Sequence, residues 1–179
     1  IGGDWVGVNT SNPNALAMEW VSNGIVPGLE GLRNLKREVK WEDSRFDLYG
    51  EMTEGGHADG LAGGLADGLA SGQNRQCFIE VKNVTLKEGE RALFPDAVTK
   101  RGRKHLNTLI RVKKAGMRAV MLYVVQRLDV RIFSPARRID PEYGKALDDA
   151  IRQGVEIIVV QARVSPESIE YHRVLPVEL

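Results

Sequence analysis

Cysteine is almost absent from the sequence, with Cys77 alone among 179 residues. A single thiol can form neither an internal disulfide nor a cysteine-based zinc site, and this usage is typical of a reducing, cytoplasmic setting. The three histidines, His57, His105 and His172, are far apart and lack metal-ligand spacing. We therefore expect no structural zinc site.

Long apolar runs and targeting signals are also missing. No run of about 18 apolar residues occurs, so no membrane span is expected. The start, Ile1-Gly2-Gly3-Asp4, has neither the basic nor the apolar region of a signal peptide. It also lacks an initiator methionine, which suggests that the sequence begins partway through a longer protein. The length of 179 residues fits one domain with an ample core.

Signatures of several ligand-binding modules are absent as well. Residues 54–76 are glycine-rich, but none of these glycines follows a strand and opens a helix as a phosphate loop requires, so we reject nucleotide binding. This low-complexity stretch has too much glycine for a stable helix, and we predict a flexible insertion between strands. No recognition helix, zinc finger or aromatic RNA-binding sheet is visible.

The charges that are present are unevenly distributed. The net charge is only +1, yet residues 99–138 contain twelve Lys and Arg residues against one acid, Asp129. Such a band is commonly a solvated helix face, but it is also the footprint of a surface that binds polyanions. Lys100, Arg103 and Lys104 lie in the first turns of a predicted helix, where cations oppose the helix dipole unless an anion is near.

Hydrophobic periodicity predicts alternating helices and strands. The predicted helices cover residues 12–24, 98–115 and 141–154, and the predicted strands cover residues 35–41, 45–49, 77–83, 119–125, 131–133, 155–160 and 169–175. A hairpin at the start followed by crossover helices indicates an α/β fold with a mixed central sheet flanked by helices.

Two charges interrupt the apolar strand at residues 77–83. Side chains alternate along a strand, so Phe78, Glu80 and Lys82 share one face. An acid and an amine near the end of a buried strand lower the stability of the fold unless they are paired or serve a function. They form either an ordinary pair at a sheet edge, worth about 0–1 kcal/mol if exposed, or a catalytic carboxylate and lysine that act on one phosphate.

Asp47 supplies a second carboxylate on a neighbouring strand. It interrupts the apolar run of residues 45–49, on the face opposite to Phe46 and Leu48. If this strand pairs with that of Glu80, the two carboxylates can share one hard cation such as Mg²⁺. A cation there would polarise a phosphodiester, and Lys82 could orient or deprotonate the attacking water. These residue types are the ones that phosphodiester hydrolysis needs.

The combination of Asp47 with Glu80-Val81-Lys82, in the order αβββαβ, resembles the PD-(D/E)XK nuclease superfamily, although Phe46 replaces its proline. Longer strings resemble the sugar fermentation stimulation protein A family. They are VGVNT (6–10), SRFD (44–47), IEVKNVTL (79–86), LFPDAVT (93–99), RGRKHL (101–106), FSPA (133–136), IDPEY (139–143) and GVEI (154–157). Two features depart from the family: the longer insertion, and Arg103 where glutamine is more frequent.

This resemblance implies a cytoplasmic DNA-binding protein linked to regulation of sugar metabolism, notably maltose. It implies a restriction-endonuclease-like domain at residues 13–179, with residues 1–12 as the remnant of, or linker from, a missing N-terminal OB-like domain. By position it implies Asp47 and Glu80 as metal ligands, Lys82 as the catalytic lysine, and Val81 as a carbonyl ligand. Glu19 is either a further ligand or a solvated helix acid.

The same resemblance implies a set of residues that contact phosphate or support the metal ligands. His105 is open to a second interpretation as an ordinary helix-surface histidine. The set comprises Arg45, Asn83, Asp96, Thr99, Lys100, Arg101, Arg103, Lys104 and His105.

Two functions follow from these features. The first is largely sequence-independent binding of DNA, which should weaken steeply with salt because the basic band tracks phosphates. The alternative is a DNA endonuclease dependent on Mg²⁺ or Mn²⁺ that uses Asp47, Glu80 and Lys82. A sugar-handling enzyme would need an aromatic-lined pocket with paired acids, and the sequence indicates none. Oligomeric state does not follow from the sequence.

Overall fold

The computed structural model describes residues 5–6, 12–52 and 76–179. The elements in chain order are α1 (Asn12–Ser22), β1 (Leu32–Trp41), β2 (Ser44–Met52), β3 (Gln76–Val84), β4 (Leu86–Glu88), β5 (Arg91–Phe94), α2 (Lys100–Lys114), β6 (Arg118–Val125), β7 (Ile132–Pro135), α3 (Pro141–Arg152), β8 (Glu156–Val164) and β9 (Ile169–Val174). Of the described helices, none is long and apolar enough to cross a membrane.

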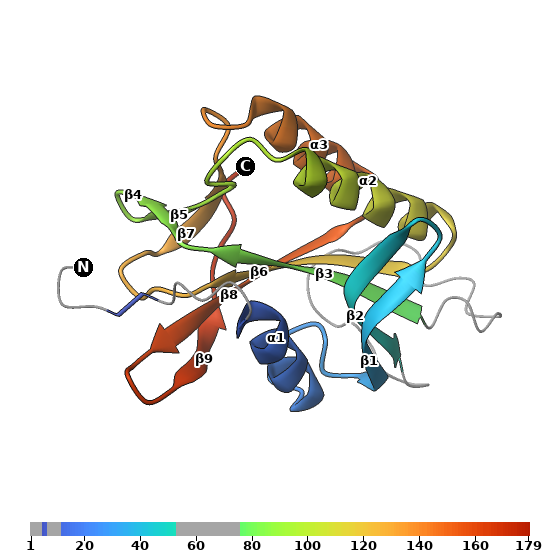
Figure 1. Ribbon diagram of the computed structural model, residues 1–179, viewed down its shortest axis with the longest axis horizontal. Helices are drawn as coiled ribbons and strands as arrows, with labels where there is room; N and C mark the ends of the chain where they lie inside the picture. Colours follow the sequence, from blue (N-terminus) through green and yellow to red (C-terminus); the bar gives the residue numbers. More distant parts are fainter. Residues whose placement is uncertain (1–4, 7–11, 53–75) are drawn as a thin grey trace.

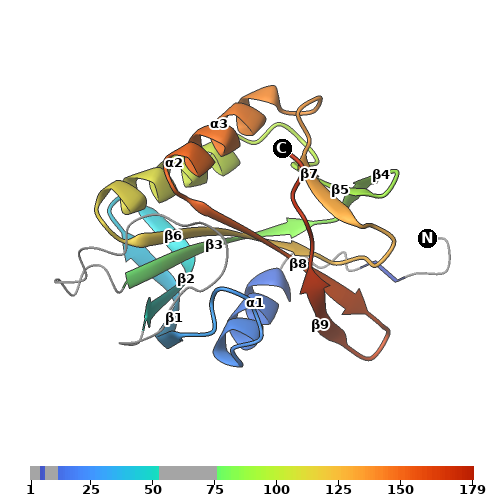
Figure 2. The ribbon, with the colours of Figure 1, turned by 180° about the vertical axis from the view of Figure 1, so that it is seen from behind.

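A six-stranded mixed sheet organises the molecule, with strand order β1-β2-β3-β6-β8-β9. β3, β6 and β8 are parallel, whereas β1, β2 and β9 run antiparallel to their neighbours. Helices α2 and α3 cover one face and α1 covers the other, as Figures 1 and 2 show from opposite sides. The predicted α/β fold, with a mixed sheet between helices, is confirmed.

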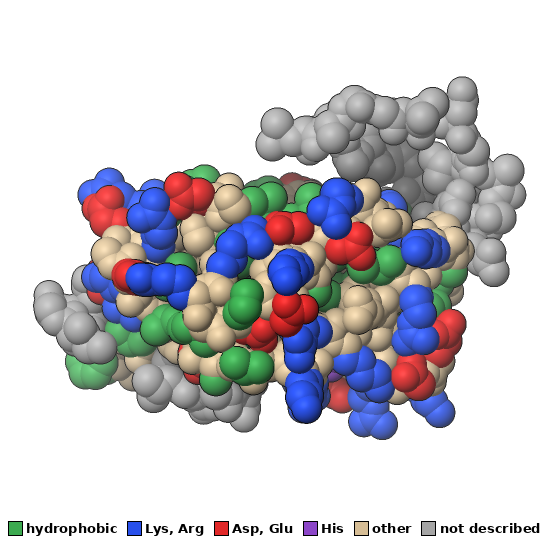
Figure 3. All heavy atoms as spheres, turned by 90° about the horizontal axis from the view of Figure 1, so that it is seen from above, with side chains coloured by type: hydrophobic (Ala, Val, Ile, Leu, Met, Phe, Trp, Pro, Cys, Tyr) green, Lys and Arg blue, Asp and Glu red, His purple; other side chains and the backbone are tan. Residues whose placement is uncertain are grey.

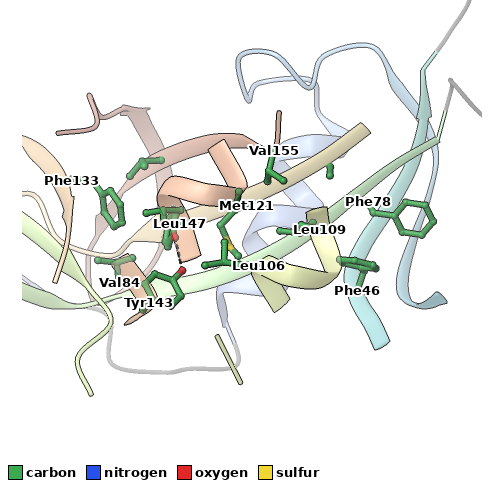
Figure 4. Packing of buried hydrophobic residues seen from close by; sticks show 14 of the residues in the cluster. Phe46, Phe78, Val84, Leu106, Leu109, Met121, Phe133, Tyr143, Leu147 and Val155 are labelled. Carbon is green, nitrogen blue, oxygen red and sulfur yellow. Dashed lines mark hydrogen bonds between the residues drawn. The ribbon is translucent and has the colours of Figure 1, made fainter. Parts of the chain in front are cut away.

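The core has two parts, one on each face of the sheet. Phe78, Leu106 and Tyr143 belong to the part beneath α2 and α3, whereas Ile79 and Val81 belong to the part beneath α1. Figure 4 shows the first part, where the hydroxyl of Tyr143 bonds that of Tyr123 at 2.6 Å. Adjacent residues of β3 thus face opposite layers, so Glu80 lies beneath the helix pair, as the alternation predicted.

The start of α2 is fixed by contacts with α3. Thr99 caps α2 by accepting a hydrogen bond from the Gly102 nitrogen at 2.9 Å. Asp140, which is 1% exposed, accepts from the backbone nitrogens of Thr99 at 2.8 Å and Tyr143 at 2.9 Å. A Cβ on Gly102 would come within 3.0 Å of the Tyr143 ring, so glycine at this position permits the close approach of α2 to α3. One buried carboxylate therefore joins both helix starts.

Several details of the sequence prediction need correction. Phe46 packs beneath α2 and α3 and Leu48 beneath α1, so these two residues do not share a face. The pairing of β2 with β3 ends at Leu48, and Glu38 on β1 has a positive φ of 56°, so simple alternation fails at this point. α2 begins at Lys100 rather than residue 98, because Thr99 is its cap.

The predicted insertion at residues 54–76 lies outside the described residues except for Gln76, which is already the first residue of β3. The predicted linker at residues 1–12 likewise lies outside them, apart from residues 5–6 and Asn12, which opens α1.

Candidate metal and phosphate site

Glu80 is the most deeply buried acid of the candidate site, with 2% of its surface exposed. It lies in the middle of β3, between the buried residues Ile79 and Val81. An ionised carboxylate at such a position is unfavourable without partners. The contacts of Glu80 therefore decide how the site works.

Lys82 and His105 both meet the same oxygen of Glu80. The Nζ of Lys82 lies 2.5 Å from Glu80 Oε1, and the Nδ1 of His105 also contacts this oxygen. The Lys82 Nζ is 3.1 Å from His105 Nδ1 and 3.4 Å from the Val81 carbonyl oxygen. β3 and the first half of α2 thus join in one polar cluster. His105 is half-buried in it rather than an ordinary surface histidine.

Asp47 lies where β2 and β3 cease to pair. Its Oδ2 accepts a hydrogen bond from the backbone nitrogen of Val81 at 2.8 Å. Its Oδ1 accepts from the side-chain amide of Asn14 at 2.7 Å. Because the last residue of β2 paired with β3 is Leu48, the Asp47 side chain takes the place of the next backbone partner. Three elements, α1, β2 and β3, fix this carboxylate.

The two carboxylates have opposite pKa shifts. Burial and the nearby charge of Glu80 raise the pKa of Asp47 above its ordinary value. Burial alone would also raise the pKa of Glu80, but hydrogen bonds and charges from His105 and Lys82 outweigh it, and the pKa is lowered. The chain's own cations therefore offset the charge of Glu80, while Asp47 remains the carboxylate that lacks a neighbouring countercharge of equal weight.

The structure does not bring every predicted residue to this cluster. Glu19 is exposed on α1, and within the described part of the chain no hydrogen bond or ion pair joins it to the other residues of the site. Asn83 accepts a hydrogen bond from Gln126 at 2.7 Å on the other face of β3. Arg45 is exposed beside Glu38 at 3.6 Å. Asp96 is exposed in the loop before α2.

Most cations of the basic band are paired with acids. Those with an ion pair are Lys104, Arg111, Arg118, Arg127, Arg131, Arg137 and Arg138. Figure 3 shows the consequence on one face, where Lys and Arg side chains lie next to Asp and Glu side chains. Five cations of the band make no ion pair with another described residue: Lys100, Arg101 and Arg103 at the start of α2, and Lys113 and Lys114 at its end. Arg101 Nε lies 3.4 Å from His105 Nε2. We call Lys100, Arg101 and Arg103 the α2 cations.

Comparison with known proteins places this arrangement in a family. The family described as "Sugar fermentation stimulation protein RE domain" matches residues 11–168. This chain belongs to the sugar fermentation stimulation protein family. A homolog from Pelobacter propionicus is 47% identical over 99% of this chain and 69% of its own length, and one from Geobacter metallireducens is 44% identical over 99% and 68%. The chain thus spans about two thirds of these relatives' length.

A solved structure of the same family supports the fold. "The structure of Pyrococcus Furiosus SfsA in complex with Ca2+" matches with a TM-score of 0.82 and 27% identity, over 99% of this chain and 68% of that one. The restriction-endonuclease-like architecture predicted for the sugar fermentation stimulation family is thus confirmed.

In this member of the sugar fermentation stimulation family, the donor set fits a hard divalent cation. Asp47 and Glu80 have carboxylate oxygens, and the carbonyl oxygen of Val81 lies 3.4 Å from the Lys82 Nζ that contacts Glu80. Among the described residues, no group of three or more His, Cys, Asp or Glu is arranged to hold a metal ion. Water and phosphate oxygens would therefore complete the coordination, which is typical of Mg²⁺ sites with one or two carboxylates.

Sequence reasoning missed Asn14 and Asp140. Asn14 lies in the first turn of a helix, and no local pattern joins it to Asp47, which lies 33 positions away. Asp140 caps the helix that follows it, and it also accepts a hydrogen bond from the residue before α2. Both contacts depend on tertiary packing, which spacing along the chain does not encode.

Proposed function

We propose that this protein binds the phosphate backbone of DNA with residues at the start of α2. One observation carries the proposal: the α2 cations are free of ion pairs with described residues and begin the helix whose His105 contacts Glu80. Cations at a helix N-terminus are unfavourable by themselves, because the helix dipole and the backbone N–H groups there favour negative charge. A bound anion therefore stabilises both the cations and the helix N-terminus. A phosphate there would lie beside a site that suits a divalent cation.

Binding of this kind depends little on base sequence. Phosphate contacts fix the position of a protein on DNA, whereas contacts to base edges supply specificity. α2 is occupied along its length by the fold, since Leu106, Leu109 and Val112 are fully buried. We accordingly assign to α2 only phosphate contacts, made by the cations at its start.

Fluorescence anisotropy with two unrelated DNA duplexes tests the binding proposal. Arg101→Ala should weaken binding to both duplexes by about tenfold or less, since a charge-assisted contact is worth roughly 1.5 kcal/mol or less at an exposed site. Lys114→Ala is the matched control, because it removes a cation from the same helix about 14 Å from His105. Equal losses in both variants, or none in either, would contradict the proposal.

A second candidate function is hydrolysis of DNA phosphodiesters. The close approach of Lys82 Nζ to Glu80 Oε1, at 2.5 Å, favours it, because both charges also act on the pKa of Asp47, which Glu80 raises and Lys82 lowers. A divalent cation such as Mg²⁺ or Mn²⁺, when bound, supplies Lewis-acid polarisation of the phosphodiester. Asp47 and Glu80 would hold it, and the Lys82 ammonium would offset the charge that develops on the phosphate.

Incubation with plasmid and linear DNA tests the hydrolysis. Wild-type protein with Mg²⁺ or Mn²⁺ should nick or linearise plasmid, while Asp47→Ala and Lys82→Ala should each lose at least about a hundredfold in rate. Glu19→Gln serves as the control and should cleave normally. Cleavage of equal strength by wild type and both site variants would identify a contaminating nuclease and remove the hypothesis.

The cellular role that we propose is regulatory. The relatives' names refer to stimulation of sugar fermentation, and we extend to this chain a role as a DNA-bound regulator of sugar metabolism, including that of maltose. A cytoplasmic location belongs to the same proposal and agrees with the buried, unpaired thiol of Cys77. Cross-linking and immunoprecipitation of the tagged protein with genomic DNA would test whether it is bound to DNA in the cell, in the same compartment as the genome. Recovery of no DNA above an untagged strain would contradict the regulatory role.

A further inference from the structure

Asn14 is the contribution of α1 to the candidate site. Its amide Nδ2 lies 2.7 Å from Asp47 Oδ1, while the backbone N–H of Val81 holds the other oxygen at 2.8 Å. Neither donor carries a full charge. The two bonds therefore fix the direction of the Asp47 carboxylate, and leave it able to accept a cation through its remaining lone pairs.

We propose that Asn14 is a positioning residue for the divalent-cation site, acting through the orientation of Asp47. The inference rests on the proposed cation site at Asp47 and Glu80. Residues that hydrogen-bond a metal-ligating carboxylate fix its geometry, and their loss typically weakens metal affinity about 10- to 100-fold. Asn14 meets this description because, among the residues that the structure describes, its amide is the side chain that donates a hydrogen bond to Asp47 Oδ1.

The opposite end of the same helix gives the contrast. Glu19 is the acid on α1 that the family resemblance offered as an extra ligand, but its side chain is exposed. Residues five positions apart on an α-helix point in directions about 140° apart. With Asn14 directed at Asp47, Glu19 is directed away from it. The helix therefore serves the site through a neutral amide rather than through a carboxylate.

Two variants of Asn14 separate its hydrogen bond to Asp47 from its other contacts. Asn14→Ala removes the donor and should weaken binding of Ca²⁺ about 10- to 100-fold. Asn14→Gln keeps an amide that can donate to Asp47, which an ionised carboxylate at this position could not do. Asn14→Gln should therefore bind Ca²⁺ several-fold more tightly than Asn14→Ala.

Isothermal titration calorimetry of the metal-free full chain with Ca²⁺ measures these affinities, with thermal melts in EDTA beside it. Glu19→Gln and Asn107→Ala are the controls, the second being an exposed asparagine on α2. Both should match wild type. A role of Asn14 in packing alone would weaken binding in both variants, so recovery of affinity by the amide of Asn14→Gln identifies positioning.

The outcomes separate this inference from the proposed function. If wild type binds Ca²⁺ and Asn14→Ala binds it equally well, the inference is overturned and the cation site stands. If Asn14→Gln weakens binding as much as Asn14→Ala does, the amide donor is not what holds Asp47, and the inference is again overturned. If wild type binds no Ca²⁺, the cation site itself is overturned and the inference with it.

Discussion

At the scale of single residues, the site is a group of charges that are only partly balanced. Lys82 and His105 contact one oxygen of Glu80, whereas Asp47 is held by two neutral donors. A buried carboxylate without a full countercharge lowers stability, and such local conflicts are expected at functional sites. Asp47 is thus the position where we expect stability and function to oppose each other.

Asp47→Asn should stabilise the metal-free protein at neutral pH. Burial and the charge of Glu80 raise the pKa of Asp47, so the folded state favours the protonated acid more than the unfolded chain does. That favourable contribution is present below about pH 4 and is lost as the pH rises through the raised pKa. The side-chain amide of the Asp47→Asn variant does not ionise, so the variant does not lose this stability as the pH rises.

Thermal melts in EDTA between about pH 4 and 7 would measure this effect. The variant should melt above wild type at pH 7, and the difference in melting temperature should narrow toward about pH 4. A variant that melts below wild type at pH 7 would show that the carboxylate is stabilising, and that the stated cause is wrong.

Much of this residue-scale picture was readable in the sequence. Glu80 and Lys82 stood out because they break an apolar strand, and their placement on one face follows from the two-residue period of strands. Asn14 could not be found in this way. Its role arises from the position of α1 relative to β2, and asparagine in a first helical turn is otherwise ordinary.

At the scale of elements, the start of α2 is positioned by α3. Asp140 accepts hydrogen bonds from the backbone of both Thr99 and Tyr143. Asp140→Ala should therefore cost about 2–4 kcal/mol in the free energy of unfolding, the sum of a lost cap and a buried N–H without a partner. Urea denaturation would measure it, with Asp149→Ala on the same helix as control. A loss no greater than that of the control would contradict the double role.

The turn between β1 and β2 neutralises part of α2. Asp43 pairs with Lys104 at 3.2 Å and with Arg111 at 2.7 Å. Asp43→Asn should release Lys104, whereas Arg111 keeps its pair with Glu42 at 2.9 Å. The variant should therefore have a higher DNA affinity, with a salt dependence steeper by about one phosphate contact. Anisotropy titrations at several salt concentrations would measure both quantities, and unchanged affinity and slope would show that Lys104 does not face the bound DNA.

Helices and strands were predicted well where apolar residues recur at a regular helical or strand spacing, and poorly where that spacing is interrupted. The buried strand β6 and helix α2, with Leu106, Leu109 and Ile110 on one stripe, follow directly from pattern. The opposite faces of Phe46 and Leu48 do not, because the pairing of β2 with β3 ends there. The short antiparallel pairing of β4 with β5 is not among the predicted strands.

At the scale of the whole molecule, the basic band is a poor guide to the charge available for DNA. Seven of its cations form ion pairs inside the described chain. Exposed pairs of this kind are weak individually, yet they reduce the field that a polyanion meets. We therefore expect DNA to be bound at the α2 cations rather than over the whole band.

The salt dependence of DNA affinity tests this central claim most directly. It compares wild type with two matched double variants, Lys100→Ala/Arg101→Ala at the start of α2 and Lys113→Ala/Lys114→Ala at its end. Each pair removes two positive charges from one helix. The measured quantity is the slope of log K against log salt for a single duplex.

Each phosphate contact contributes about −0.9 to this slope. The account predicts that the Lys100/Arg101 variant has a slope shallower than wild type by about 1.8, while the Lys113/Lys114 variant keeps the wild-type slope. Equal slopes in wild type and the Lys100/Arg101 variant, or a loss confined to the Lys113/Lys114 variant, would contradict the claim that DNA is held at the start of α2.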